Sequence, residues 1–208
     1  MKLGILFSGG KDSAYSAFLA KKNGYEISCF ITLESENKES YMFHTPFIDK
    51  TKLQASAIQI SQIIQKTKGK KEEELMDLEK AIKTAVKKYK IQGIVSGAVG
   101  SVYQSSRIQN ICNKLNLECF APLWQKNQFE ILDDLIKNQF EVIIAGVFAE
   151  GLDKDWIGKK IDKNFIEKMR ELNKKYGVNP AGEGGEYETF VLNCPLFKKP
   201  VKLSEVKI

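Results

Sequence analysis

Short apolar runs and segments of helical period alternate along the first part of this chain. These runs are too short for helices and are typical of buried strands; they span 3–7, 26–33, 91–98 and 117–123, and a short third strand is predicted over 63–67. The helical patterns between them span 14–20, 50–60, 73–89 and 99 to about 115. Strands separated by helices predict parallel pairing, because each helix returns the chain to the same end of the sheet. We therefore expect an α/β fold with a Rossmann-like (HUP-type), doubly wound parallel sheet of about five strands.

The pattern changes after Trp124. It predicts a helix over 129–140, a strand over 141–148, a charged helix over 164–176 and a strand over 189–192. No Pro/Gly/Ser-rich linker separates this part from the first, so we expect two closely packed lobes and not two tethered domains. The predicted division is into residues 1–124 and a smaller C-terminal α+β lobe of residues 125–208.

Composition narrows the class of protein. The 208 residues are 43% hydrophobic, and no apolar run is long enough to cross a membrane. The N-terminus enters a strand directly, so we expect no targeting signal, a cytoplasmic location and no membrane partner. The four cysteines, at 29, 112, 119 and 194, have no C-x-x-C spacing. We interpret them as reduced, buried thiols.

The net charge of +6 comes from 32 Lys and Arg against 26 Asp and Glu. A basic surface of this kind is compatible with nucleic acid or a ribosome-associated partner. However, many lysines lie beside acids, and no basic stripe is interleaved with aromatic residues. We therefore expect no direct recognition of nucleic acid.

The glycine–lysine loop, Ser8-Gly9-Gly10-Lys11-Asp12-Ser13, lies between the first strand and the first helix. Paired glycines let the backbone approach a ligand closely, and the helix that follows offers unpaired N–H groups to an anion. Lys11 adds a positive charge on what we expect to be an exposed loop. The Walker pattern fails, because Ile5 and Asp12 stand where it requires Gly and Ser or Thr. An ordinary helix-capping turn is the alternative, but the complete segment favours a phosphate site.

Further candidate positions follow the later strands. Ligands lie beyond the carboxyl ends of the strands in doubly wound sheets, so Ile31 to Glu34, with Ile31 and Thr32 as candidate contacts, are expected beside the loop. Gly97 and Ala98 are small and leave room for a nucleotide.

Three polar residues lie near the start of the helix that begins at about residue 99. They are Tyr103, Gln104 and Arg107. Tyr103 and Arg107 share a helix face, and Arg107 can bind a phosphate or carboxylate or form a surface salt bridge. His44 is the only histidine and lies in a predicted loop over 34–49. It is either a ligand contact or a packed or surface residue.

The acidic segment, residues 179–189, combines three carboxylates with three glycines and cannot form a regular helix. The carboxylates are Glu183, Glu186 and Glu188, and the glycines are Gly182, Gly184 and Gly185. This composition indicates either an acidic surface loop or a place where backbone and carboxylates converge on a ligand. Carboxylates there can hold Mg²⁺, bind a cation or accept a proton from an amine.

With the glycine–lysine loop at one end and the acidic segment at the other, the chain resembles the diphthine–ammonia ligase family of N-type ATP pyrophosphatases over nearly its whole length. Between and beyond those ends, the resemblance includes Ser40–Thr45, Ser96–Ala98, Tyr103–Arg107, Ala121–Trp124, Glu150–Asp153 and Cys194–Phe197. The family usually has acids at the positions of Val102, Ser56 and Asn193, so this chain departs from it there.

This resemblance implies ATP-dependent amidation of diphthine, a modified histidine of translation elongation factor 2 that carries a carboxylate and a trimethylammonium group. The reaction would pass through an acyl-adenylate, consume ammonium, and release AMP and pyrophosphate. Residues 1–124 would bind ATP, and residues 125–208 would bind the second substrate.

The same resemblance implies roles for individual residues. Contacts to ATP are expected from Ser8, Gly9, Gly10, Lys11, Asp12, Ser13, Ile31, Thr32, His44, Gly97 and Ala98, with Asp12 holding Mg²⁺. Catalytic roles are expected for Lys11, Glu183, Glu186 and Glu188, the three acids serving the second substrate. Contacts to that substrate are expected from Tyr103, Gln104, Arg107, Glu183, Gly184, Gly185 and Glu186.

Two other functions stay open. One is an ATP pyrophosphatase that modifies tRNA, which would require a catalytic cysteine pair or a basic extension, and neither is evident. The other is a nucleotide-binding module without catalysis. The oligomeric state is open as well, with a homo-oligomer among the alternatives.

Overall fold

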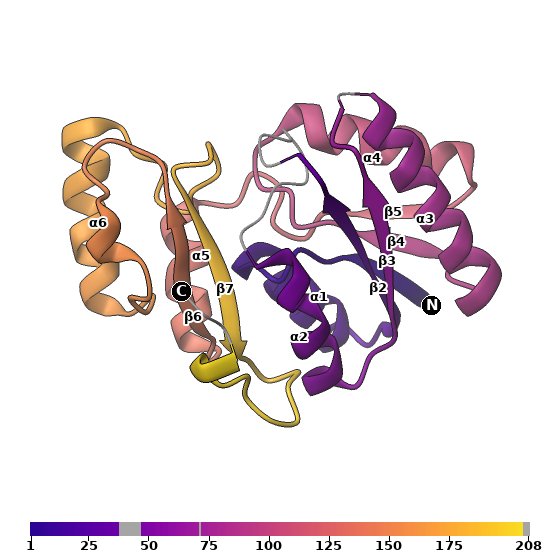
Figure 1. Ribbon diagram of the computed structural model, residues 1–208, viewed down its shortest axis with the longest axis horizontal. Helices are drawn as coiled ribbons and strands as arrows, with labels where there is room; N and C mark the ends of the chain where they lie inside the picture. Colours follow the sequence, from indigo (N-terminus) through magenta and orange to yellow (C-terminus); the bar gives the residue numbers. More distant parts are fainter. Residues whose placement is uncertain (38–46, 71, 206–208) are drawn as a thin grey trace.

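Five strands form a parallel sheet in the N-terminal lobe of the computed structural model (Figure 1). The structure describes residues 1–37, 47–70 and 72–205. The strands are β1 (Lys2–Leu6), β2 (Glu26–Ser35), β3 (Gln62–Thr67), β4 (Gly93–Val95) and β5 (Glu118–Phe120). Their order across the sheet is β3-β2-β1-β4-β5, and every neighbouring pair is parallel. The predicted α/β fold with a doubly wound parallel sheet is confirmed.

Helices cover both faces of this sheet. They are α1 (Lys11–Lys22), α2 (Thr51–Ile58), α3 (Glu73–Tyr89) and α4 (Val102–Lys114). Leu3 and Ile5 of β1 pack in the cluster that contains residues of α1 and α2, whereas Ile31 and Leu33 of β2 pack in the cluster of α3 and α4. The chain leaves β1 for β2 on one side and later returns to β4 on the other, which creates a switch point beside β1. Ligands of doubly wound sheets bind beyond the strands at such a point.

The C-terminal lobe is a two-stranded antiparallel ribbon with helices. Its elements are α5 (Gln128–Lys137), β6 (Glu141–Val147), α6 (Lys163–Tyr176) and β7 (Tyr187–Asn193), and β6 pairs with β7. Short 3₁₀ helices lie at η1 (Ile48–Lys50), η2 (Lys154–Trp156) and η3 (Leu203–Glu205). Figure 1 shows β7 facing α1 and α2, with α6 on the outer side of the ribbon. This arrangement agrees with the expected α+β lobe.

One buried core joins the two lobes. Ala17 of α1, Leu132 of α5 and Val191 of β7 belong to the same hydrophobic cluster. The backbone N–H of Val191 also donates a 3.0 Å hydrogen bond to the carbonyl oxygen of Gly9. Close packing is as expected, and the division at residue 124 stays a prediction.

Several predicted boundaries differ from the observed ones. The first helix begins at Lys11 and not at residue 14, so the second half of the glycine–lysine loop is the first helical turn. The fourth and fifth strands end early, at Val95 and Phe120. A turn that contains Pro122 follows β5, and proline has no N–H with which to continue the hydrogen bonding of the sheet.

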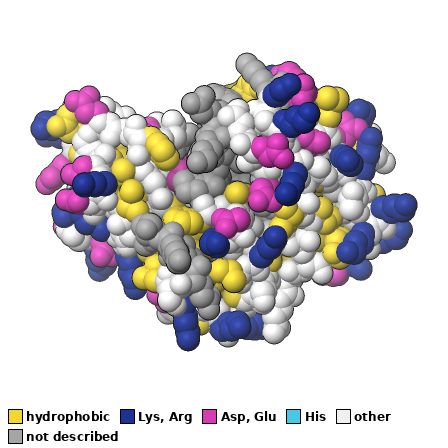
Figure 2. All heavy atoms as spheres, in the orientation of Figure 1, with side chains coloured by type: hydrophobic (Ala, Val, Ile, Leu, Met, Phe, Trp, Pro, Cys, Tyr) yellow, Lys and Arg dark blue, Asp and Glu magenta, His cyan; other side chains and the backbone are white. Residues whose placement is uncertain are grey.

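The surface and the thiols agree with a globular protein of mixed charge. On the face shown in Figure 2, Lys and Arg side chains spread over both lobes among Asp and Glu and form no single stripe. All four cysteines are free thiols; Cys119 is partly buried and the other three are buried. Within the described ranges, no helix has the length and apolar character needed to cross a membrane.

Candidate active site

A cavity of about 720 Å³ lies where the two lobes meet. The ends of β1 and β2 and the first turn of α1 form one side, and the acidic segment forms the other. The predicted positions that line it are Ser8, Gly10, Lys11, Asp12, Ser13, Ile31, Gly97, Ala98, Gln104, Glu183, Gly184, Gly185 and Glu188. The structure therefore brings the glycine–lysine loop and the acidic segment into one site.

The glycine–lysine loop is held by its own hydroxyl groups and by the C-terminal lobe. Ser13 Oγ donates to the carbonyl oxygen of Gly10 at 3.0 Å and lies 3.3 Å from Ser8 Oγ. Gly9 has a φ of +80°, and a Cβ there would collide with Oε1 of Gln54. The N-cap residue of α1, Gly10, makes no capping hydrogen bond through a side chain, and this N-terminus opens onto the cavity. A helix N-terminus in this position is suited to bind an anion.

Lys11 is buried, not exposed as the sequence led us to expect. Only 3% of its surface is accessible, because it begins α1 against the C-terminal lobe. Its ammonium donates to Asp12 Oδ2 at 2.8 Å and to the carbonyl oxygen of Ala181. The backbone N–H of Lys11 donates to Thr189 Oγ1 at 3.0 Å. The expectation of an exposed loop was wrong because packing between the lobes covers the loop.

Asp12 has the features of a Mg²⁺ ligand. Its Oδ1 is buried and has no hydrogen-bond partner in the described part of the chain. Mg²⁺ is usually held by one or two carboxylates together with phosphate oxygens and water, so a single unpaired carboxylate oxygen beside a phosphate site fits the ion. The residues described form no group of three His, Cys, Asp or Glu side chains that could hold a metal by themselves. A Mg²⁺ bound here would therefore need oxygens from the nucleotide.

Glu188 is an acid of the site whose pKa is raised. Its side chain is half-buried at the cavity, and burial raises its pKa to about 7; the nearby Lys11 lowers this pKa and Asp12 raises it. No described residue forms a hydrogen bond or ion pair with its carboxylate. A carboxyl group that titrates near neutrality inside a cavity is a candidate for a functional residue.

The other two predicted acids are held by backbone groups. Glu183 Oε1 accepts hydrogen bonds from the N–H groups of Gly100 and Ser101, at 2.7 and 2.9 Å. Glu186 does not line the cavity. Its two oxygens accept from the backbone N–H and side-chain amide of Asn179 and from the backbone N–H of Gly184, at 3.0, 2.5 and 2.8 Å. These contacts hold the Glu186 carboxylate within the acidic segment.

The candidate residues of α4 divide into two groups. Gln104 lines the cavity, whereas Tyr103 and Arg107 do not. The guanidinium of Arg107 stacks 3.5 Å from the Tyr103 ring centroid and pairs with Glu72 at 3.1 Å. This is the surface salt bridge that the sequence left open as the alternative.

The remaining candidates have mixed positions. Ile31 lines the cavity, but Thr32 is buried and its Oγ1 donates to the carbonyl oxygen of Phe7 at 2.6 Å, which ties β2 to the end of β1. Gly97 lies against the first turn of α1, where a Cβ would come within 2.8 Å of the Ser13 nitrogen. His44 lies outside the described residues.

Sequence reasoning did not single out several residues of the site. Thr189, Tyr187 and Phe148 line the cavity. Gln54 is fully buried, and its amide donates to the carbonyl oxygens of Gly9 and Val191 at 2.9 and 2.7 Å. Thr189 and Tyr187 adjoin the predicted acids, and Phe148 ends a predicted strand, so their places in the sequence could have identified these three residues. Gln54 is one polar residue in an amphipathic pattern, and nothing in the sequence distinguishes it.

Comparison with known proteins identifies the family. Residues 1–119 match the diphthamide synthase N-terminal domain, and residues 127–208 match the diphthamide synthase C-terminal domain. A protein of Mus musculus named diphthine–ammonia ligase is 37% identical over 97% of this chain and 82% of its own length. The Homo sapiens protein of the same name has the same identity and coverage.

Likeness to a solved structure is much weaker. A chain described as a predicted subunit of a tRNA methyltransferase from Methanocaldococcus jannaschii is 19% identical, with coverage of 96% of this chain and 99% of that one and a TM-score of 0.48. That likeness has no bearing on function, whereas the matched domains and the relatives extend over nearly the whole sequence. The chain belongs to the diphthamide synthase family.

Proposed function

We propose that this protein is an ATP-dependent diphthine–ammonia ligase that amidates diphthine on translation elongation factor 2. Membership of the diphthamide synthase family and the names of the relatives support the reaction class. The observation that carries the proposal is the meeting of two groups in one cavity. A buried lysine at a helix N-terminus and the acidic segment line the same cavity and contact each other there.

The proposed reaction has two steps. In the first, an oxygen of the diphthine carboxylate attacks the α-phosphorus of ATP, the bond to the β,γ-phosphates breaks, and pyrophosphate leaves with the electron pair. In the second, ammonia attacks the acyl carbon of the acyl-adenylate, AMP leaves, and one proton is released. The products are the amide, AMP and pyrophosphate.

The glycine–lysine loop would serve the first step. Negative charge develops on the leaving pyrophosphate, and the N-terminal N–H groups of α1 together with the Lys11 ammonium would stabilise it. Because the Asp12 carboxylate and a backbone oxygen already hold Lys11, its charge needs no reorganisation during the reaction. Mg²⁺ bound at Asp12 would neutralise further phosphate charge.

The acidic segment would serve the second substrate. Of its three acids, Glu188 faces the cavity with a carboxylate that no described residue neutralises by direct contact. Glu183 and Glu186 hold backbone groups and would keep the segment in place. In this proposal the glycine–lysine loop binds the phosphates on one side of the cavity, and the acidic segment binds the acceptor substrate on the other. A cytoplasmic location, where elongation factor 2 works, belongs to the same proposal.

Product analysis tests this function. Protein should be incubated with diphthine-bearing elongation factor 2, ATP, Mg²⁺ and ammonium, then analysed by intact mass and by chromatography of nucleotides. We expect conversion of the carboxylate to the amide, with AMP and pyrophosphate in equal amounts and no turnover without the acceptor. ADP and phosphate as main products would overturn the pyrophosphatase chemistry. ATP binding without turnover would favour a non-catalytic module.

A further inference from the structure

Phe148 is an exposed aromatic residue at the edge of the cavity. Its accessible fraction is 63%, although most large hydrophobic side chains of this protein are buried. The other described large hydrophobics that are exposed are Met1, Met76, Val102, Tyr176 and Leu203, and none of them lines the cavity. Because ligand sites are lined mainly by apolar and aromatic side chains, an aromatic ring in the cavity lining is a candidate for ligand contact.

The strand register places Phe148 near Glu188. Gly146 pairs with Glu188 across the β6–β7 ribbon, and the backbone N–H of Phe148 donates to the carbonyl oxygen of Glu186 at 2.8 Å. Phe148 and Glu188 are therefore diagonal neighbours on one face, about 7–8 Å apart at the backbone, which long side chains can span. Gly146, directly opposite Glu188, has no side chain to separate the pair. Glu186 lies directly opposite Phe148, but its carboxylate is bonded to Asn179 and to the backbone N–H of Gly184.

The charges around this pair leave Glu188 as the acid available to a ligand. The ammonium of Lys11 is paired with Asp12, and the carboxylates of Glu183 and Glu186 accept hydrogen bonds from backbone N–H groups. Among the described residues, the carboxylate of Glu188 has no such contact. One face of the cavity thus offers an acid and an aromatic ring together.

We infer that Phe148 and Glu188 bind the quaternary trimethylammonium group of the acceptor substrate. This inference rests on the proposed function and deepens it. A quaternary ammonium has no N–H to donate, so it gains little from hydrogen-bond acceptors and is bound by aromatic faces and by nearby negative charge. The pair supplies both: the Phe148 ring offers an aromatic face and the Glu188 carboxylate offers negative charge.

Direct binding of a probe tests the site without any turnover. The dissociation constant of tetramethylammonium should be measured by NMR titration for the wild-type protein and for Phe148→Leu, Phe148→Trp and Glu188→Gln. Phe148→Leu keeps an apolar side chain but removes the ring, so we expect binding about 3- to 30-fold weaker. Phe148→Trp keeps an aromatic face and should retain the affinity for tetramethylammonium. Glu188→Gln removes the negative charge and should weaken binding.

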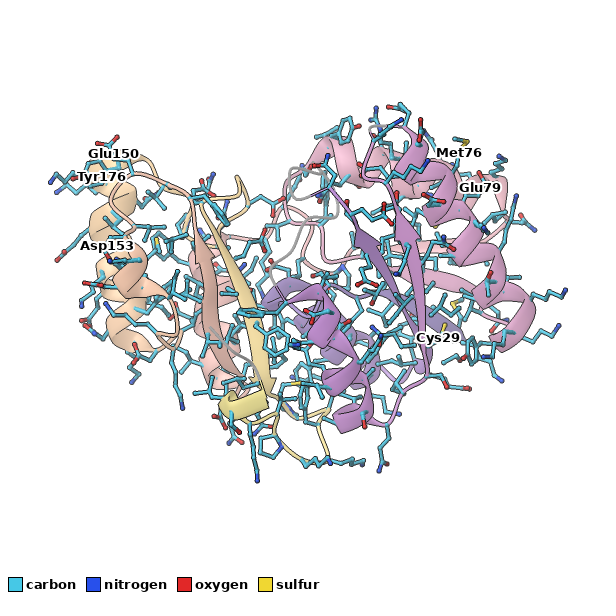
Figure 3. All side chains as sticks on the ribbon, viewed as in Figure 1. Cys29, Met76, Glu79, Glu150, Asp153 and Tyr176 are labelled. Atoms are coloured by element: carbon cyan, nitrogen blue, oxygen red, sulfur yellow. The ribbon has the colours of Figure 1, made fainter. Side chains whose placement is uncertain are left out.

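A matched control comes from α6. Tyr176 is also an exposed aromatic residue and lies on the outer helix, away from the cavity lining (Figure 3). Tyr176→Leu should leave binding of tetramethylammonium unchanged. Equal affinity in the wild type and Phe148→Leu would overturn the inference, and so would the absence of saturable binding by the wild type.

Kinetics separate this inference from the proposed function. With saturating ATP and Mg²⁺, Phe148→Leu should raise the KM for diphthine-bearing elongation factor 2 about 3- to 30-fold while changing kcat and the KM for ATP little. A loss confined to kcat would contradict a binding role. If the wild type bound tetramethylammonium through Phe148 but formed no amide, the proposed function would fail while the cation site remained.

Discussion

The carboxylate of Glu183, in the C-terminal lobe, accepts a 2.7 Å hydrogen bond from the backbone N–H of Gly100, in the N-terminal lobe. The same oxygen accepts from Ser101, immediately before α4. An anion therefore satisfies N–H groups at the start of that helix, where the helix dipole favours negative charge. This contact fixes the acidic segment relative to the sheet and so fixes the shape of the cavity.

Removing the hydrogen bonds that Glu183 accepts from Gly100 and Ser101 should destabilise the protein. Glu183→Ala leaves the N–H groups of Gly100 and Ser101 without their acceptor, and we expect the free energy of unfolding to fall by about 1–2 kcal/mol. Glu183→Gln keeps an acceptor oxygen but loses the charge, so its loss should be smaller. Urea denaturation of both variants measures the difference. Wild-type stability in Glu183→Ala would show that water replaces the carboxylate at no cost.

Lys11→Met should impair both folding stability and ATP cleavage. The substitution leaves the Asp12 carboxylate beside a buried apolar chain, and losing one partner of such a pair costs on the order of 2–3 kcal/mol. Adding Asp12→Asn removes the uncompensated charge, so the double variant should regain part of the stability. Neither variant should cleave ATP. Thermal unfolding and AMP release measured on the same samples separate the two effects, and ATP turnover in either variant would contradict the role of Lys11.

Gly9→Ala should disrupt the glycine–lysine loop. Its φ of +80° strains any residue with a Cβ, and the added methyl group would meet the Gln54 side chain. The matched control is Gly24→Ala, because Gly24 has a φ of +82° but nothing within 4 Å of the added Cβ. The control should cost about 1–2 kcal/mol from backbone strain alone. Gly9→Ala should lower the free energy of unfolding by more than this and should also weaken ATP binding. Equal losses of stability in the two variants would show that the Gln54 side chain moves aside for the methyl group.

The periodicity of apolar residues predicted the helices and strands, because it reflects which face of each element is buried. The helix at Glu73–Tyr89 has an apolar face of helical period and was predicted with its observed boundaries. β4 was predicted too long, because Ser96 to Ala98 are apolar or small but lie at the cavity and not in the ladder. Residue composition does not reveal where a sheet stops to make room for a ligand.

The sequence indicated which segments line the cavity, but not which contacts each of their side chains makes. The glycine–lysine loop and acidic segment do meet, as their residue types indicated. The burial of Lys11 and the difference between Glu186 and Glu188 depend on contacts with Ala181, Thr189 and Asn179, which tertiary packing creates. Three acids within six residues look alike in a sequence; their partners distinguish them.

Glu188→Gln should change how stability depends on pH. The pKa of Glu188 rises from 4.5 in the unfolded chain to about 7 in the fold, mainly through burial. As the pH rises, the unfolded chain therefore releases this proton first, which favours unfolding. The stabilising contribution of Glu188 is complete below pH 4.5 and is lost as the pH rises through about 7.

Glutamine keeps the shape of the side chain and has no proton to release, so the variant should lack this loss. At about pH 8 we expect Glu188→Gln to have a free energy of unfolding higher than that of the wild type by on the order of 2–3 kcal/mol, with little difference near pH 4. Urea denaturation at both pH values, without nucleotide or metal, measures it. The exposed Glu171→Gln on α6 is the control and should show no such trend. A variant that is no more stable than the wild type at the higher pH would mean that the Glu188 carboxylate is ionised there at no cost, because water or a cation reaches it in the cavity.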